Sequence, residues 1–156
     1  MVDIQTVSIA IASASVVAGV VYYALQIQHQ KKMRQTDLVV RLYSTMTNRD
    51  WLDAWDRVQS MQIIDPSKID LNRMRAEHQI ADLNTVVAIF DELGVLLQMR
   101  LIDIDLVERL FHRHVTSIWE KFKPVFEQVR QSANDPRLGE GFEYLYNEVK
   151  KREQRK

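Results

Sequence analysis

The stretch that decides the fold is residues 7–25, VSIAIASASVVAGVVYYAL, which carries no charged side chain. As a helix that rises about 1.5 Å per residue, its 19 residues would extend about 28 Å, close to the hydrocarbon thickness of a bilayer. Tyr22 and Tyr23 lie near its carboxyl end, and aromatic rings favour the interface between membrane and water. We therefore expect residues 1–30 to form one transmembrane anchor.

Two other interpretations of this segment are open. A cleaved signal peptide has a basic start and a shorter apolar region, whereas the only formal charge before Lys31 is that of Asp3. A buried core helix of a soluble domain would accommodate the hydroxyl residues Thr6, Ser8, Ser13 and Ser15. The length of the apolar run favours the membrane helix over both.

Basic residues follow the apolar run at once, and they predict its orientation. Lys31, Lys32 and Arg34 would lie at the lipid headgroups, where they can also contact anionic lipid. Because positive charge is enriched on the cytoplasmic side, we expect a single-pass protein of the cell membrane with its N-terminus outside and the rest of the chain in the cytoplasm.

Small residues recur at intervals of four along the apolar run. Ala10, Ala14 and Ala18 share one helix face, and Gly19 lies beside them. Such a face lets two helices approach closely in lipid, so it predicts packing against a second copy or another subunit. Alanine is also common in membrane helices, and the same residues can be mere filler.

The composition of the whole chain excludes several classes of protein. Lys plus Arg and Asp plus Glu each number 21, and the isoelectric point is near 6.9, so no global field attracts nucleic acid. The absence of Cys excludes disulfides, thiolate metal sites and cysteine nucleophiles. Only 4 Gly and 3 Pro are present, too few for the turns of an all-β fold. We therefore predict an all-α protein.

Helical periodicity continues after the anchor. Leu38, Leu42 and Met46 recur at intervals of four, which predicts a juxtamembrane amphipathic helix over residues 31–50. A small cytoplasmic helical bundle is expected over residues 51–150. Its first helix is capped near Asn48 and presents one face that consists of Leu52, Trp55 and Gln59. Residues 151–156 form a basic tail, which either frays in solvent or contacts lipid.

The longest expected helix of the bundle covers Asp70 to Met99. Its apolar residues form two lines, which predicts a central helix; they are Ile80, Leu83, Val87, Phe90, Gly94 and Leu97, with Val86, Ile89, Leu93 and Leu96. Gly94 costs about 1 kcal/mol relative to Ala inside a helix, which indicates a close helix crossing or a local break. The next helix should begin with Asp103 as its cap, and Pro124 should kink or restart it.

Several short motifs of the chain resemble a prokaryotic family of small proteins. These motifs are LDAW at residues 52–55, FDELGVL at 90–96, LIDIDLV at 101–107, WEKFKP at 119–124 and FEYLY at 142–146. The family resemblance implies one N-terminal membrane helix and a helical cytoplasmic domain of unknown function. It implies no reaction.

Two sets of side chains could carry chemistry. Glu108 and His112 are four residues apart and can share a metal ion, but we favour an ion pair with Arg109 or Arg113 on a solvated helix face. The carboxylates of the central helix, Asp82, Asp91 and Glu92, suit acid–base work if they are buried, or they pair with Lys121 or Lys123 at the rim of the apolar seam. No nucleotide-binding loop or serine-nucleophile motif occurs.

The aromatic residues leave two functions open. Trp51, Trp55 and Trp119 either fill the bundle core or line a groove. We favour a non-enzymatic membrane-anchored interaction module without a cofactor, an accessory or scaffold subunit that binds itself or a larger membrane complex. The alternative is a membrane-tethered enzyme or ligand sensor whose pocket would contain Trp119, His112, Asp91 and Glu92.

Overall fold

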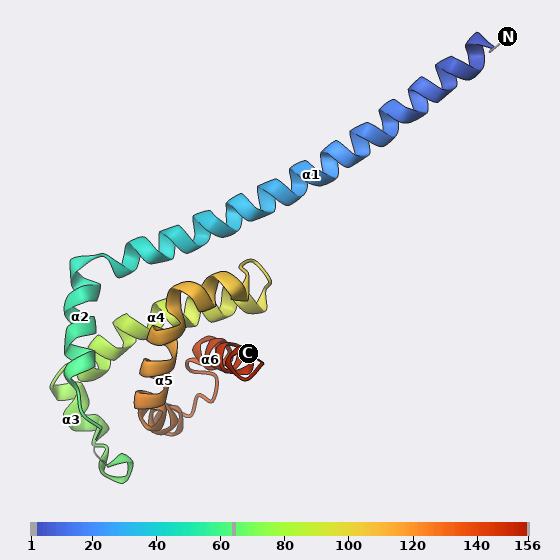
Figure 1. Cartoon of the computed structure of the whole chain (residues 1–156). Coiled ribbons are helices and arrows are strands. Elements are labelled where there is room, and N and C mark those ends of the chain that lie inside the picture. The colour runs from blue at the N-terminus through green and yellow to red at the C-terminus, as the bar shows by residue number, and fades with distance from the viewer. Residues whose placement is uncertain (1–2, 64, 156) are drawn as a thin grey trace. The chain divides into compact units, whose positions relative to one another are not determined.

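The computed structural model describes residues 3–63 and 65–155, without the side chains at positions 6, 7, 10 and 67. All regular structure in this part is helical, which confirms the predicted class (Figure 1). The elements are α1 (Ile4–Met46), α2 (Arg49–Ser60), the 3₁₀ turn η1 (Pro66–Lys68), α3 (Leu71–Ala76), α4 (Gln79–Gln98), α5 (Ile104–Ala133) and α6 (Glu140–Glu153). They form two compact units, of which the first ends at Asp37 and the second begins at Leu38.

The first unit is a single helix, the larger part of α1. Its described side chains are almost all exposed, including Val16 and Leu25, which are 67% and 60% accessible. The hydroxyls of Ser8, Ser13 and Ser15 donate to the carbonyls four residues earlier, at 2.9, 2.8 and 2.8 Å. By length and composition this helix is long and apolar enough to cross a membrane, and none of its apolar window is buried within the chain.

The end of α1 belongs to the second unit. Residues 31–46 continue α1 without interruption, so the helix expected over residues 31–50 is the last part of a longer one. Leu38, Val39, Leu42 and Met46 pack against the hydrophobic core, as their spacing predicts. The chain then turns, and Asn48 caps α2 by accepting the N–H of Asp50 at 3.4 Å.

The buried face of α2 differs from the expected one. Trp51, Ala54 and Val58 are buried, whereas Leu52 is 46% exposed. Both faces contain large apolar or aromatic side chains, so the helical pattern of twelve residues alone does not say which one meets the core.

The prediction of a single helix from Asp70 to Met99 is wrong, because the helix is interrupted at His78. This residue has a φ of 61°, in the left-handed region, and it separates α3 from α4. Residues 70–86 contain no glycine or proline, so no local pattern signals the break. The break allows two helix directions, and Met74 of α3 and Leu83 of α4 are both buried in the same core.

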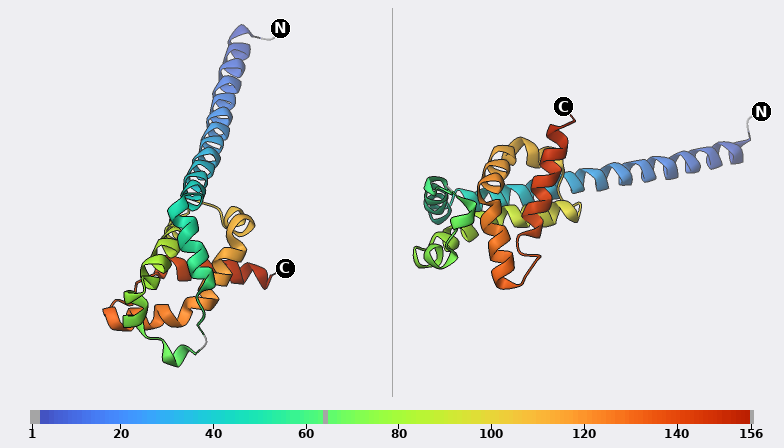
Figure 2. Two further views of the ribbon diagram at one scale, coloured as in Figure 1. Left: turned by 90° about the vertical axis from the view of Figure 1, so that its left-hand side faces the viewer. Right: turned by 90° about the horizontal axis from the view of Figure 1, so that it is seen from below.

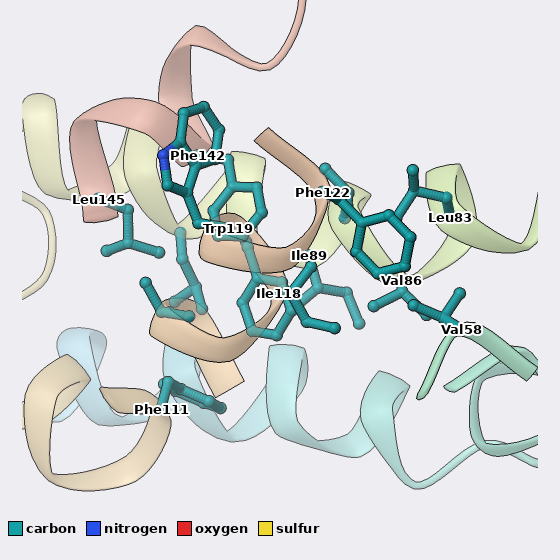
Figure 3. Close-up of a cluster of buried hydrophobic side chains, with 14 of the residues drawn as sticks. Val58, Leu83, Val86, Ile89, Phe111, Ile118, Trp119, Phe122, Phe142 and Leu145 are labelled. Atoms are coloured by element: carbon teal, nitrogen blue, oxygen red, sulfur yellow. The ribbon is translucent and has the colours of Figure 1, made fainter. Parts of the chain in front are cut away.

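Helix α4 is central, as its two apolar lines predict. It packs most extensively against α6 and also contacts α2, α3 and α5 (Figure 2). Both lines are buried except Ile80 and Leu96, which are partly buried. Figure 3 shows Leu83, Val86 and Ile89 from this helix among side chains of α2, α5 and α6.

The close crossing predicted at Gly94 is present between α4 and α6. A Cβ atom built on Gly94 would overlap the backbone carbonyl of Gly141, and one built on Gly141 would overlap the carbonyl oxygen of Asp91. Glycine at both positions therefore lets the two backbones touch. The contact brings Phe142 beside Phe90, with ring centroids 5.2 Å apart.

Helix α5 begins where the sequence predicts, and of the two alternatives at Pro124, a kink or a restart, it does not restart. Asp103 caps it by accepting the N–H of Asp105 at 2.8 Å. The helix does not restart at Pro124 but runs through it to Ala133. Figure 1 shows that α5 changes direction along its length, which a proline without an N–H favours.

We expect Gly94→Ala to destabilise the second unit by about 3 kcal/mol, because the new methyl group must push α6 away from α4. Its unfolding midpoint should fall by about 10 °C. The measurement is thermal unfolding of the full chain in detergent, followed by near-ultraviolet circular dichroism of the tryptophans. Gly19→Ala is the matched control, since no atom lies within 4 Å of a Cβ at Gly19. Equal midpoints for the two variants would contradict the close crossing.

Candidate functional site

Asp91, a candidate for acid–base chemistry, caps a neighbouring helix. It is partly buried on α4, and its Oδ1 accepts the N–H of Phe142 at 3.0 Å. Gly139, the N-cap residue of α6, has no side chain to do this. The carboxylate of Asp91 therefore satisfies one of the free N–H groups at the start of α6, where the helix dipole also favours negative charge.

Asp82 and Glu92 lie in different surroundings. The Arg57 guanidinium donates two hydrogen bonds to Asp82, Nε to Oδ2 at 2.8 Å and Nη2 to Oδ1 at 2.7 Å. These hydrogen bonds hold the pKa of the Asp82 carboxyl below its usual value, against a smaller effect of burial. Asp82 is thus an ionised partner that connects α4 to α2, and Glu92 is exposed.

Lys121, one of the partners expected for these carboxylates, binds backbone instead. Its ammonium group donates to the carbonyls of Val58 and Gln59 at 3.1 and 2.7 Å. Burial lowers the pKa of this lysine. Lys121 therefore caps the carboxyl end of α2 from α5, where a cation is favoured.

His112 and Glu108 line an open hollow of about 360 Å³ on α5, together with Arg109 and Glu153. Arg152 of α6 pairs with Glu108 (Nε to Oε2, 3.4 Å) and also with Asp105. No three His, Asp or Glu side chains in the described part of the chain are placed to hold a metal ion. Glu108 is thus paired across helices, with Arg152 of α6.

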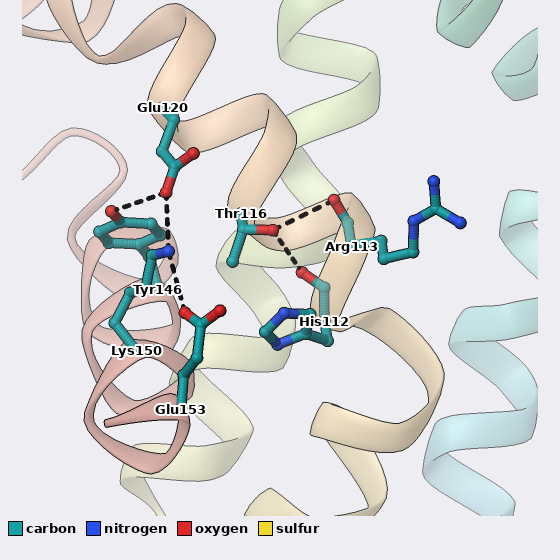
Figure 4. A network of polar contacts seen from close by, with 7 residues as sticks. All are labelled: His112, Arg113, Thr116, Glu120, Tyr146, Lys150 and Glu153. Carbon is teal, nitrogen blue, oxygen red and sulfur yellow. Dashed lines mark hydrogen bonds and ion pairs between the residues drawn. The ribbon is translucent and has the colours of Figure 1, made fainter. Parts of the chain in front are cut away.

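Polar contacts also fasten the end of α6 to α5 (Figure 4). Lys150 pairs with Glu120 at 2.9 Å and with Glu153 at 3.0 Å, and hydrogen bonds to these two carboxylates raise the pKa of its ammonium group. The hydroxyl of Tyr146 donates to Glu120 at 3.3 Å. Residues 151–153, expected as part of a basic tail, are consequently helical.

Trp119 fills the core. It is 3% exposed, and its ring lies 5.1–5.8 Å from those of Phe126, Phe142 and Tyr146. Trp119, Asp91 and Glu92 are absent from the lining of three hollows among the described residues, and His112 lines one of these three without them. The structure thus does not bring the four candidate residues together.

Sequence reasoning missed a second hollow, between α2 and α5. It measures about 460 Å³ and is lined by Trp55, Gln59, Arg113, His114 and Ser117. The Trp55 ring stacks on Trp51 with centroids 5.1 Å apart, and it lies 5.1 Å from the His114 ring. The four-residue spacing of Trp51 and Trp55 was a signal for their stacking, but no local pattern pairs α2 with this part of α5.

Burial lowers the pKa of His114, and the nearby Arg113 lowers it further. The imidazole is therefore neutral at physiological pH. Its Nδ1 atom is buried and has no hydrogen-bond partner in the described part of the chain. His114 and His112 line different hollows.

The predicted membrane-contact residues lie on the exposed helix of the first unit. Ala14 and Ala18 are exposed, and Gly19 has open space around it. The side chain of Ala10 lies outside the described residues. The basic residues Lys31, Lys32 and Arg34 are also exposed.

We expect Asp91→Ala to destabilise the second unit by about 1–2 kcal/mol, because the N–H of Phe142 loses its acceptor. Asp91→Asn keeps an oxygen acceptor and should lose less than half as much. Denaturant unfolding followed by tryptophan fluorescence measures both. The neighbouring exposed Glu92→Ala is the control and should have no effect. If Asp91→Ala unfolds like Glu92→Ala, the capping role is refuted.

A comparison with known families identifies the chain as a whole. The family model described as a domain of unknown function, DUF4760, matches residues 10–149, which include both the apolar helix and the helical domain. Searches of curated proteins and of solved structures found no match. The resemblance expected from the short motifs is to this extent confirmed, and the chain belongs to the DUF4760 family.

Proposed function

We propose that this protein is a membrane-anchored, non-catalytic interaction module. In this proposal α1 crosses a cell membrane once, and the helical domain binds a protein partner as an accessory or scaffold subunit. The observation that supports this proposal most directly is the apolar surface of α1, on which Ile9, Val16 and Leu25 are 67%, 67% and 60% exposed. A continuous apolar surface of this kind is unfavourable in water and stable in lipid.

The polar groups of the same helix support a lipid environment. The hydroxyls of Ser8, Ser13 and Ser15 donate hydrogen bonds to backbone carbonyls of the previous helical turn. No water is then needed to satisfy them, which is the requirement that the hydrocarbon region imposes. A core helix of a soluble protein would be covered by its own domain, whereas this window is not buried at all.

The orientation follows from the charges. Lys31, Lys32 and Arg34 lie in the exposed helix directly after the apolar run. The positive-inside rule then places the N-terminus outside and the helical domain in the cytoplasm. From the resemblance of the short motifs we also propose that the family consists of prokaryotic single-pass membrane proteins.

The uses of the charged side chains support a non-catalytic role. Asp91 caps α6, Asp82 pairs with Arg57, and Lys121 caps α2. Each has a partner that explains it structurally. The partner surface that we propose in the membrane is the small-residue face of Ala10, Ala14, Ala18 and Gly19, which would admit the close approach of a second copy or of a subunit in a larger complex.

The topology can be tested in the natural background, because the chain contains no cysteine. We expect Asp3→Cys to react with a membrane-impermeant maleimide on intact cells and Glu140→Cys to react only after lysis. Both variants should stay in the membrane pellet after carbonate extraction at full chain mass. Release by carbonate, loss of the N-terminal segment, or the opposite labelling pattern would contradict the proposed anchor.

The association can be tested by enlarging the small-residue face. We expect Ala14→Leu combined with Gly19→Leu to abolish self-association or co-purification of a membrane partner, because two backbones can no longer approach closely. The measurement is native mass analysis after purification in mild detergent. Val16→Leu combined with Val20→Leu, a double change on the side of the helix away from Ala14, should leave the complex intact. An unchanged assembly in the double variant would refute this surface.

A further inference from the structure

The hollow between α2 and α5 is a built feature of the second unit. Trp55 and Gln59 line it from α2, and Arg113, His114 and Ser117 line it from α5. Lys121 holds the carboxyl end of α2 against α5 one turn beyond Ser117. The two walls are therefore fixed to each other independently of the residues that face the hollow.

The charge of this hollow distinguishes it from the other two. Arg113 is charged, and no carboxylate is among the five lining residues. Two other hollows among the described residues carry charges of both signs: one is lined by Asp65, Asp70 and Glu77 together with Lys68 and Arg73, and another by Glu108 and Glu153 together with Arg109. Its surroundings thus favour an anion.

The guanidinium of Arg113 is available to such an anion. Within residues 3–63 and 65–155 this guanidinium forms no ion pair and donates no hydrogen bond. The side chain of Thr116 donates a hydrogen bond to the backbone carbonyl of Arg113 at 3.4 Å, which leaves the guanidinium uninvolved. Figure 4 shows the side chain extended away from His112. A guanidinium in this state can bind a carboxylate or phosphate through two parallel hydrogen bonds.

The aromatic wall adds a second recognition element. Trp55 is half-buried, supported by the stacked ring of Trp51 at 5.1 Å, and lies against the imidazole of His114. Because burial and Arg113 keep this imidazole neutral, it does not compete with Arg113 for the anion. The two neighbouring rings hold Trp55 in place, so the part of its ring that lines the hollow is a rigid apolar surface for a ligand.

We infer that this hollow binds a small planar aromatic anion, with its ring against Trp55 and its anionic group on Arg113. The amide of Gln59 and the hydroxyl of Ser117 lie at the same wall and can bind further polar groups of the ligand. A volume of about 460 Å³ suits a small molecule rather than a folded segment of protein. This inference is independent of the membrane anchor and of the partner proposed above.

The test is a titration of the full chain, labelled with ¹⁵N in its tryptophans and held in lipid nanodiscs. The chain has 3 Trp, so three indole N–H signals report separately, and Trp55→Phe assigns the relevant one. The probe is 2-naphthoate, and neutral 2-naphthamide is its uncharged counterpart. We expect a saturable shift of the Trp55 signal with 2-naphthoate and no shift of the buried Trp119.

Variants separate the two recognition elements. Arg113→Gln should weaken the binding of 2-naphthoate about tenfold, because a pair of charged hydrogen bonds is lost. The affinity for 2-naphthamide should not change. Arg109→Gln, a matched change in the other hollow of α5, should alter neither affinity. Absence of a saturable Trp55 shift overturns the inference. The inference is also overturned if Arg113→Gln weakens the binding of 2-naphthoate and of 2-naphthamide equally. It is likewise overturned if Arg109→Gln weakens the binding of 2-naphthoate as much as Arg113→Gln does.

Discussion

The contact between the backbones of α4 and α6 is the constraint on which the second unit depends. Gly94 and Gly141 lie so close that neither position has room for a methyl group, and Asp91 accepts the N–H of Phe142, in the first turn of α6, at the same place. Steric fit and hydrogen bonding therefore fix one crossing point together. Once α6 is held there, Phe142 enters the core beside Phe90 and Trp119.

Beyond this crossing, polar contacts between helices define the positions of the other helices in the second unit. Arg130 of α5 pairs with Glu143 at 2.7 Å near the start of α6, and Lys150 pairs with Glu120 near its end. Arg57 and Asp82 connect α2 to α4. Isolated surface pairs of this kind contribute little stability, about 0–1 kcal/mol, so their effect is to select one arrangement of helices already joined by the core.

The two units of the chain satisfy opposite requirements. In the second unit the large apolar side chains are gathered in one core, and charged side chains such as Arg57, Asp82 and Lys121 bind each other or free helix ends. In the first unit the apolar side chains face outward, and the polar hydroxyls are turned back onto the helix. Water suits the former arrangement and lipid the latter, which is the physical basis of the proposed anchor.

The sequence by itself determined the features that depend on near neighbours: the helical class, the apolar run of α1, the caps at Asn48 and Asp103, and the central helix α4. Even the close crossing was predictable, because Gly94 is costly in a helix without one. Only the tertiary structure decided the break at His78, the role of Asp91 and the hollow at Trp55. Asp91 and Phe142 are 51 residues apart, and contacts over such separations arise from packing that no local pattern encodes.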